Sequence, residues 1–209
     1  MATVITVAQQ KGGTGKTTLV ANIAAAMAAG RRVAVLDTDP QRSLARWHSL
    51  RAARNGAASG ISFGGVSGWR IGGELDRLRR NHDLILIDSP PQIDTDAKIA
   101  IRAADLVLIP VQPSPPDLWA AEGTLALAAS ERRTIRIVLN RTPPSSRLRE
   151  SVEADIAARH LPVLRSALGN RTGFALAFAE GLGVTEAAPR SAAAGELRAL
   201  IQEIEVLRQ

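Results

Sequence analysis

One stretch near the start of the chain limits its fold more than any other. It reads Gln-Lys-Gly-Gly-Thr-Gly-Lys-Thr-Thr over residues 10–18, after an apolar run at 4–7 and before a helix-like run that begins near Lys16. Glycines between a strand and a helix let backbone N–H groups turn inward and approach phosphate oxygens. The positive end of the following helix points at the same place. We call residues 10–18 the phosphate loop, and it predicts an anion site between the first strand and the first helix.

The side chains of the phosphate loop have separate expected roles. Lys16 can reach the β- and γ-phosphates of a nucleotide, and the Thr17 hydroxyl can bind the Mg²⁺ that bridges them. Thr18 is placed to reach the α-phosphate. The rest of the cradle is expected from the residues between the two lysines of the loop, which are Gly12, Gly13, Thr14 and Gly15.

The rest of the chain alternates apolar strands with helical segments. Expected strands lie at 32–36, 61–66, 84–87, 106–109, 135–139 and, as a short one, 163–164. Expected helices follow the phosphate loop and lie at 43–54, 71–80, 95–104, 118–131, 148–159, 173–180 and 192–207. Continuous apolar strands separated by helices indicate an α/β domain with a mostly parallel, twisted sheet covered on both faces. A ligand is expected at the carboxyl edge of that sheet.

Acidic residues fall at this edge. The strand at 33–36 leads into Asp37 and Asp39, and the strand at 84–87 leads into Asp88. Buried strands that end in a carboxylate present it to a metal-bound phosphate, so Asp88 is expected to hold Mg²⁺ directly or through water.

Composition excludes several classes of protein. None of the 209 residues is cysteine, which excludes disulfides, thiolate metal sites and iron–sulfur clusters. The longest apolar helical stretch, 19–29, is shorter than the roughly 18 residues of a membrane span, and no cleavable leader is visible. These features predict a cytoplasmic protein. The formal net charge of +6 favours binding to polyanions.

Four motifs carry a resemblance to a known family. The phosphate loop has Gln10 where the common pattern has Gly, and Lys11 adds a second lysine, giving K-G-G-x-G-K-T. The others are D-x-D-P-Q at 37–41, D-x-P-P at 88–91 and P-V-Q-P-S-P-x-D at 110–117. Together they resemble the ParA/MinD family of deviant Walker A ATPases, nearest to the short, ParF-like partition ATPases. The resemblance covers nearly the whole chain and implies a P-loop NTPase fold.

The resemblance also implies roles for individual residues. Lys11 would reach across a dimer interface to the partner's nucleotide and, with Lys16 and Asp39, serve catalysis. Asp39 would position the attacking water, and Asp37 would support the water shell of Mg²⁺. Asn140-Arg141 stands where the family has the asparagine that reads adenine. A side-chain amide can donate to and accept from adenine, and the guanine-reading N-K-x-D is absent, so ATP is expected.

DNA binding is expected from arginines late in the chain. The stretch 171–186 resembles R-x-x-x-x-x-A-x-x-x-G-x-x-V-x-E, whose arginine the family uses for non-specific DNA contact. Arginines without interleaved aromatics suit phosphate contact, so binding should ignore sequence. The candidates are Arg147, Arg149, Arg165, Arg171 and Arg190.

The resemblance implies an ATP-dependent positioning ATPase. Its ATP-bound sandwich dimer would bind double-stranded DNA of the nucleoid, and a ParB-like adaptor would stimulate Mg²⁺-dependent hydrolysis and release. Residues 1–209 would form a single ATPase domain with no separate N-terminal DNA-binding domain. The cargo stays open between a plasmid, a chromosome locus and a large protein assembly.

Other members of the wider class are less suited to this sequence. The nitrogenase iron protein needs a cysteine and the bacterial tyrosine autokinases need a tyrosine tail, and the chain has neither residue. A MinD-like membrane ATPase needs a basic amphipathic last helix, whereas the polar face at 192–207 carries Glu196, Glu203 and Glu205. That helix is expected to pack on the domain. A small-molecule phosphotransferase of the dethiobiotin-synthetase kind would not need Lys11 together with D-x-D-P-Q.

Overall fold

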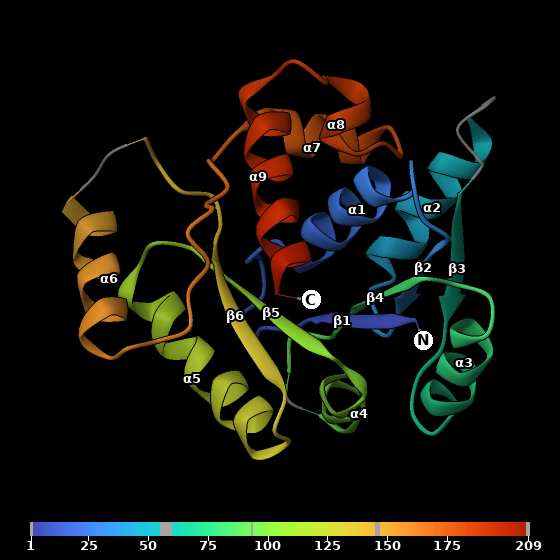
Figure 1. The fold of residues 1–209 in the computed structure, drawn as a ribbon, viewed down its shortest axis with the longest axis horizontal. Helices are drawn as coiled ribbons and strands as arrows, with labels where there is room; N and C mark the ends of the chain where they lie inside the picture. The colour runs from blue at the N-terminus through green and yellow to red at the C-terminus, as the bar shows by residue number, and fades with distance from the viewer. Residues whose placement is uncertain (1, 55–59, 93, 145–146, 208–209) are drawn as a thin grey trace.

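Six parallel strands form the centre of the protein. The computed structural model describes residues 2–54, 60–92, 94–144 and 147–207. Its strands are β1 (Thr3–Val7), β2 (Val33–Asp37), β3 (Ile61–Gly65), β4 (Leu84–Asp88), β5 (Leu106–Val111) and β6 (Thr134–Leu139). They form one sheet in the order β3-β2-β4-β1-β5-β6 (Figure 1). The predicted parallel α/β sheet is therefore confirmed.

Helices cover both faces of the sheet. They are α1 (Lys16–Met27), α2 (Ser43–Ala53), α3 (Arg70–Arg79), α4 (Thr95–Ala103), α5 (Pro115–Ser130), α6 (Arg147–Ala158), α7 (Thr172–Ala179), α8 (Val184–Ala187) and α9 (Ala192–Val206). One apolar cluster joins the sheet to α1, α2 and α7–α9, which lie above it in Figure 1. Two further clusters join the other face to α3–α6.

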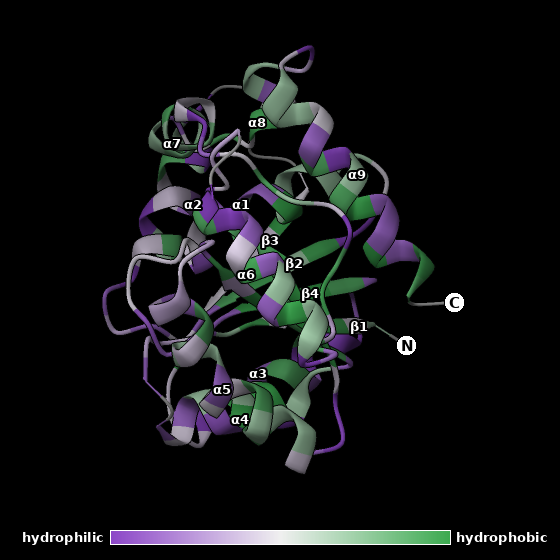
Figure 2. Cartoon of the chain, turned by 90° about the vertical axis from the view of Figure 1, so that its left-hand side faces the viewer, coloured by the Kyte–Doolittle hydropathy of each residue, from purple (hydrophilic) through white to green (hydrophobic). Residues whose placement is uncertain are grey.

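The period of the strands explains this double cover. Alternate side chains of a strand point to opposite faces, so a strand that is apolar at every position must be buried on both. In β4, Leu84 and Leu86 join the cluster on the α1 face, whereas Ile85 and Ile87 join the cluster under α3. Apolar strands enclosed by helices with polar outer surfaces are visible in Figure 2.

Register brings the ends of the strands together. In the pairing of β2 with β4, Asp37 lies opposite Asp88, and in the pairing of β1 with β4, Val7 lies opposite Asp88. The phosphate loop follows β1 directly. The two carboxylates and the loop therefore meet at one edge of the sheet.

A few elements differ from the sequence-based expectation. Helix α5 begins at Pro115 rather than 118, because Ser114 accepts a hydrogen bond from the Asp117 N–H and prolines fit the first helical positions. The four-residue α8 was not predicted. Around Val163 the chain forms an isolated bridge to Ile137 rather than a strand.

The last helix packs on the domain, as predicted. In α9, Leu197, Leu200 and Ile204 are buried in the cluster that also contains α1. Among the described helices, none is long and apolar enough to span a membrane.

Candidate nucleotide-binding site

Backbone geometry shapes the phosphate loop. Gly13 and Gly15 have φ of 78° and 92°, a left-handed region that residues with a Cβ rarely adopt. A Cβ on Gly15 would lie 2.6 Å from Nδ2 of Asn140. Glycine is therefore required at position 15 both by conformation and by close contact. Directly after it, α1 begins and presents its free N–H groups to the loop.

The loop lines a cavity of about 260 Å³, which we call the phosphate cavity. Asp39 reaches it from the loop after β2, and Arg141 reaches it from the loop after β6. The remaining lining residues are Gly12, Gly13, Gly15, Lys16, Thr17, Thr18, Gln41, Ser43, Pro91 and Phe178. The structure thus brings together most of the phosphate-binding and catalytic residues predicted from sequence.

Lys16 lies at the floor of this cavity. Its residue is only 7% exposed, and burial lowers the pKa of its ammonium group, against the raising effect of the Asp88 and Asp39 carboxylates. A buried ammonium needs an anionic partner. A nucleotide phosphate is such a partner.

Asp88 is the most unusual group of the site. Both carboxylate oxygens are buried, and no hydrogen-bond partner for either is found among the described residues. Burial raises the pKa of this carboxyl to about 8, against the lowering effect of the nearby Thr17 hydroxyl and Lys16 ammonium, and repulsion from Asp37 adds to the rise. A buried polar group without a partner is unfavourable, and a cation would relieve it.

The donor set of this edge fits Mg²⁺. Hard oxygen ligands suit this ion, which is usually held by one or two carboxylates together with substrate phosphates. Asp88 and the Thr17 hydroxyl supply such ligands beside the phosphate cavity. In the described residues no group of three or more His, Cys, Asp or Glu side chains is placed to hold a metal alone.

Asp37 shapes the loop that carries Asp39. Its Oδ1 accepts a hydrogen bond from the Asp39 N–H at 3.1 Å, and its Oδ2 accepts one from the Ala45 N–H at 2.9 Å. Burial raises the pKa of Asp37, while these backbone N–H groups lower it. This bracing of the loop was missed in the sequence. The expected role of Asp37 near the water shell of Mg²⁺ stays a prediction.

Asn140 braces the phosphate loop. Its Nδ2 donates to the Thr14 carbonyl at 2.7 Å, and its Oδ1 accepts from the Arg141 N–H at 3.0 Å. It also lines a second cavity of about 230 Å³ beside the loop, which we call the base cavity. Apolar side chains such as Leu168 and Phe174 line this cavity together with polar ones such as Asn170. Besides Asn140, the lining residues are Gly15, Thr18, Leu19, Asn22, Arg141, Leu168, Gly169, Asn170, Arg171, Thr172, Phe174 and Ala175.

Comparison with known proteins agrees with this geometry. Residues 5–184 match the family described as the CobQ/CobB/MinD/ParA nucleotide binding domain. The chain belongs to this family. The maintenance of carboxysome distribution protein A of Halothiobacillus neapolitanus is 31% identical, over 96% of this chain and 95% of its own length. The chromosome-partitioning ATPase Soj of Thermus thermophilus is 29% identical, over 96% of this chain and 94% of its own length.

Solved structures of this family share the fold. The structure of apo McdA from Cyanothece has a TM-score of 0.81 and 18% identity, covering 98% of this chain and 100% of that chain. The ParA/MinD resemblance that was read from the four motifs is therefore confirmed, as is the fold that it implied.

The side chain of Lys11 is directed away from the phosphate cavity and toward α5. Its Nζ lies 2.6 Å from Oδ2 of Asp117, at the start of α5. It is absent from the described residues that line the phosphate cavity of this MinD/ParA-type chain. The expected role of Lys11 in a partner's site stays a prediction.

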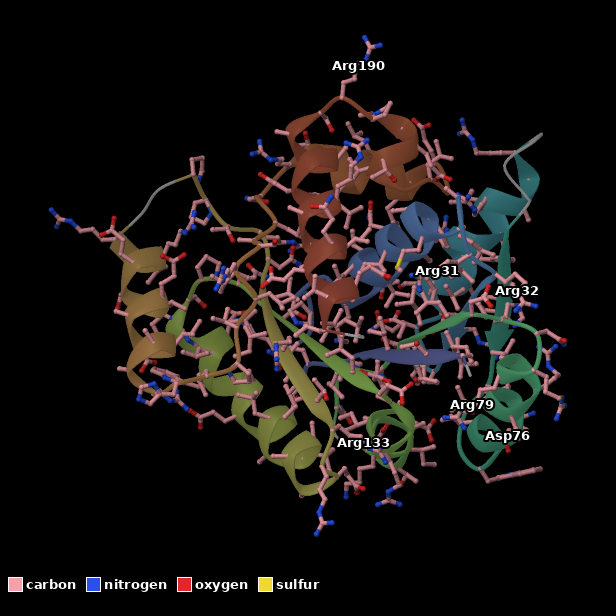
Figure 3. All side chains as sticks on the ribbon, viewed as in Figure 1. Arg31, Arg32, Asp76, Arg79, Arg133 and Arg190 are labelled. Atoms are coloured by element: carbon pink, nitrogen blue, oxygen red, sulfur yellow. The ribbon has the colours of Figure 1, made fainter. Side chains whose placement is uncertain are left out.

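Three of the five candidate DNA-binding arginines line neighbouring cavities, and the other two lie elsewhere on the surface. Arg149 and Arg171 line one cavity of about 220 Å³ with Glu196, and Arg149 and Arg165 line another beside α6. Arg171 is paired with Glu196 at 2.6 Å, and Arg149 with Glu153 at 2.7 Å. Arg147 lies exposed at the start of α6, and Arg190 projects from the turn between α8 and α9 (Figure 3).

The stretch 171–186 also has a packing role that the sequence did not reveal. Glu186 pairs with both terminal nitrogens of the buried Arg51 on α2, at 2.7 and 2.8 Å. Gly181 has φ of 72°, and a Cβ there would lie 2.3 Å from the Arg51 backbone nitrogen. Ala177 and Val184 are buried. The motif therefore joins α7 and α8 to α2, the helix that follows Asp39.

Proposed function

We propose that this chain is an ATP-dependent positioning ATPase. ATP binding would assemble a homodimer that binds double-stranded DNA without regard to sequence, and adaptor-stimulated hydrolysis would release it. The observation that carries the proposal is the phosphate cavity, in which Lys16 and Asp39 converge on a glycine cradle beside the buried carboxylate of Asp88.

The residues of the cavity suit phosphoryl transfer to water. This reaction depends mainly on positioning and on stabilising charge at the phosphate oxygens. Loop N–H groups and Lys16 would bind the phosphates, while Thr17 and Asp88 would hold Mg²⁺, which when bound would supply positive charge at the phosphate oxygens. Asp39 would orient the attacking water, and its backbone N–H is held by the Asp37 carboxylate.

Adenine is the base that we propose for the base cavity. Asn140 and Arg141 line this cavity, and Asn140 also donates a hydrogen bond to Thr14 of the phosphate loop. The same residue would therefore contact the base and support the loop that binds the phosphates. The order of the two cavities along α1 matches the order of base and phosphates in a nucleotide.

Two relatives support a positioning role. They are the carboxysome distribution protein and the chromosome-partitioning ATPase described above. The net charge of +6 and the arginines around α6 and Glu196 favour a polyanion. We propose that residues 1–209 act as one domain, that the protein works in the cytoplasm on the nucleoid, and that a ParB-like adaptor links it to its cargo.

A comparison of stimulators tests this function against the alternatives. Phosphate release from ATP should rise when duplex DNA and the adaptor are both added, and duplex binding should require ATP rather than ADP. A rise with anionic vesicles would favour a MinD-like membrane ATPase, and a rise with a small carboxylic acid would favour a phosphotransferase. Hydrolysis that ignores DNA and adaptor would contradict the proposal.

A further inference from the structure

The first half of the phosphate loop is held by the segment that joins β5 to α5. Gln112 donates from Nε2 to the Gly13 carbonyl at 3.2 Å. The side chain of Gln10 packs against Gly123 of α5 so closely that a Cβ there would lie 2.0 Å from Nε2 of Gln10. Lys11, between them, is paired with Asp117. These three contacts hold the loop from outside the phosphate cavity, whose lining among the described residues includes none of Gln10, Lys11 and Gln112.

Asp117 is built as a partner for a cation. Its side chain is only 3% exposed, whereas that of Lys11 is 42% exposed. Its Oδ2 accepts hydrogen bonds from Lys11 and from the Ser114 hydroxyl, and among the described residues its Oδ1 has no partner. The carboxylate also lies in the first turn of α5, where the helix dipole favours negative charge. Lys11 therefore satisfies a buried anion that would otherwise lack a cation.

The same contact takes Lys11 away from the phosphates of its own subunit. Lys16 lines the phosphate cavity, and Lys11 ends at Asp117 instead. Because the Lys11 Nζ is held 2.6 Å from Asp117 Oδ2, its ammonium group is directed at this carboxylate of its own subunit. Any reach of Lys11 toward another subunit must therefore begin by leaving Asp117.

We propose that Asp117 is a positioning residue that retains Lys11 in the free subunit and so sets the threshold for ATP-dependent dimerisation. The inference rests on the proposed function, in which the nucleotide phosphates of a partner replace Asp117 as the anion beside Lys11. Exchange of one anion for another makes dimerisation depend on a loaded partner, since an empty partner offers no replacement.

The free subunit allows a direct test of the retention. Only Lys11, Lys16 and Lys98 carry side-chain amines in this sequence, so amine acylation followed by peptide mass spectrometry resolves each site. Without nucleotide, Asp117→Asn should raise the acylation rate of Lys11 by about fivefold and leave that of the exposed Lys98 unchanged. Ser114→Ala should act in the same direction but less. An unchanged rate at Lys11 in a variant with an unaltered circular dichroism spectrum would overturn the proposal.

Dimerisation is then measured by sedimentation with a non-hydrolysable ATP analogue. Asp117→Asn should lower the dimer dissociation constant by about fivefold, because Lys11 no longer leaves an ion pair. In a Lys11→Ala background the same substitution should have no effect. Glu122→Gln is the matched control, since Glu122 lies on the same helix and pairs with Arg159 instead of the loop. Weaker or unchanged dimerisation of Asp117→Asn would overturn the threshold.

The two readouts separate this inference from the proposed function. If the unmodified chain binds the analogue but stays monomeric, the proposed function fails, while the acylation rates still decide whether Asp117 retains Lys11. If the unmodified chain dimerises and only the Asp117 variants behave otherwise than expected, the inference fails and the proposed function stands.

Discussion

At the scale of single residues, the site contains side chains that the folded chain alone leaves unsatisfied. Asp88 is buried without a hydrogen-bond partner among the described residues, and Lys16 is buried beside it. Such groups lower stability unless a ligand completes them. We therefore interpret their burial as preparation for a nucleotide and its metal ion rather than as a contribution to the fold.

This interpretation predicts opposite effects of Asp88→Asn on stability and on activity. Without nucleotide, the variant should unfold at higher urea concentration, with a gain of about 1–2 kcal/mol, because a carboxyl whose pKa burial raises to about 8 no longer has to take up a proton when the chain folds at neutral pH. Mg²⁺-dependent ATP hydrolysis should be lost. Urea titrations with and without ATP and Mg²⁺ provide the measurement. A loss of stability in the nucleotide-free chain would show that Asp88 has a partner there after all.

Different effects are expected for the two lysines of the phosphate loop. Lys16→Ala should abolish ATP binding, because Lys16 lines the phosphate cavity. Lys11→Ala should keep part of the binding and lose dimerisation and turnover. Equilibrium binding of a fluorescent ATP analogue and sedimentation separate the two properties. Normal dimerisation of Lys11→Ala would contradict the role of Lys11 in a partner's site.

Asp39→Ala should separate binding from hydrolysis. The cradle stays intact, so ATP binding and dimerisation should persist, while hydrolysis slows by about 100-fold or more because the water is no longer oriented. The variant should therefore remain on DNA after ATP is added. Phosphate release measured together with DNA anisotropy checks both expectations, and undiminished turnover would remove Asp39 from this role.

At the scale of elements, α2 connects the loop that carries Asp39 to residues that line the base cavity. Its start is set by the Asp37 hydrogen bonds, and its end is tied to α8 by the Arg51–Glu186 pair. Between these points Trp47 is fully buried and donates from Nε1 to the Leu182 carbonyl at 3.2 Å. Packing of α2 thus links Asp39 to α7, whose residues Thr172 and Phe174 line the base cavity.

Two glycine substitutions test the contact between α2 and the turn after α7. Gly181→Ala should destabilise the chain by about 3 kcal/mol, since its Cβ meets the α2 backbone and its φ is positive. Gly195→Ala is the matched control: it lies in α9 with nothing within 4 Å and should stabilise by about 0.5–1 kcal/mol. Urea unfolding of both variants gives the comparison. Equal changes in the free energy of unfolding would mean that the turn after α7 can shift to accept a Cβ at position 181.

At the scale of the whole molecule, the site lies where the strand order reverses. Because β1 is between β4 and β5, Asp37 and Asp88 come from one half of the sheet, and Asn140 and Asp117 come from the other. Ligands in open α/β sheets bind in the crevice at such a point. Of the arginines proposed for DNA, Arg147, Arg149, Arg165 and Arg171 lie around α6 and the start of α7, whereas Arg190 lies on the turn between α8 and α9 (Figure 3).

DNA binding should therefore depend on these arginines in a salt-dependent way. Arg165→Ala and Arg171→Ala should each weaken binding of two unrelated duplexes equally and reduce the salt slope by about one. Arg77→Ala is the control. Arg77 pairs with Glu74 on α3, which follows β3 at the opposite edge of the sheet from β6. Anisotropy titrations over a salt series, with ATP or with ADP, give the result. Equal DNA affinity with ATP and with ADP would contradict the proposal that ATP binding is needed for DNA binding.

Local patterns predicted the sheet and the phosphate cavity well, and long-range contacts account for most of what they missed. The run Leu-Ile-Leu-Ile-Asp predicts both a buried strand and the carboxylate at its end. No local pattern joins Lys11 to Asp117, 106 positions away, or Asn140 to Thr14, 126 positions away. The start of α5 was missed because prolines at its first turn resemble a loop. Arg171 was interpreted without Glu196, which the fold places against it.

The buried carboxylate of Asp88 has a consequence for the lifetime of the protein in the cell. A ligand that binds only the folded chain shifts the folding equilibrium by mass action. Proteases act on the transiently opened chain, so empty subunits would be degraded faster than loaded ones. The abundance of the protein would then follow the supply of its nucleotide, and starvation would reduce the number of molecules as well as the pace of their cycle.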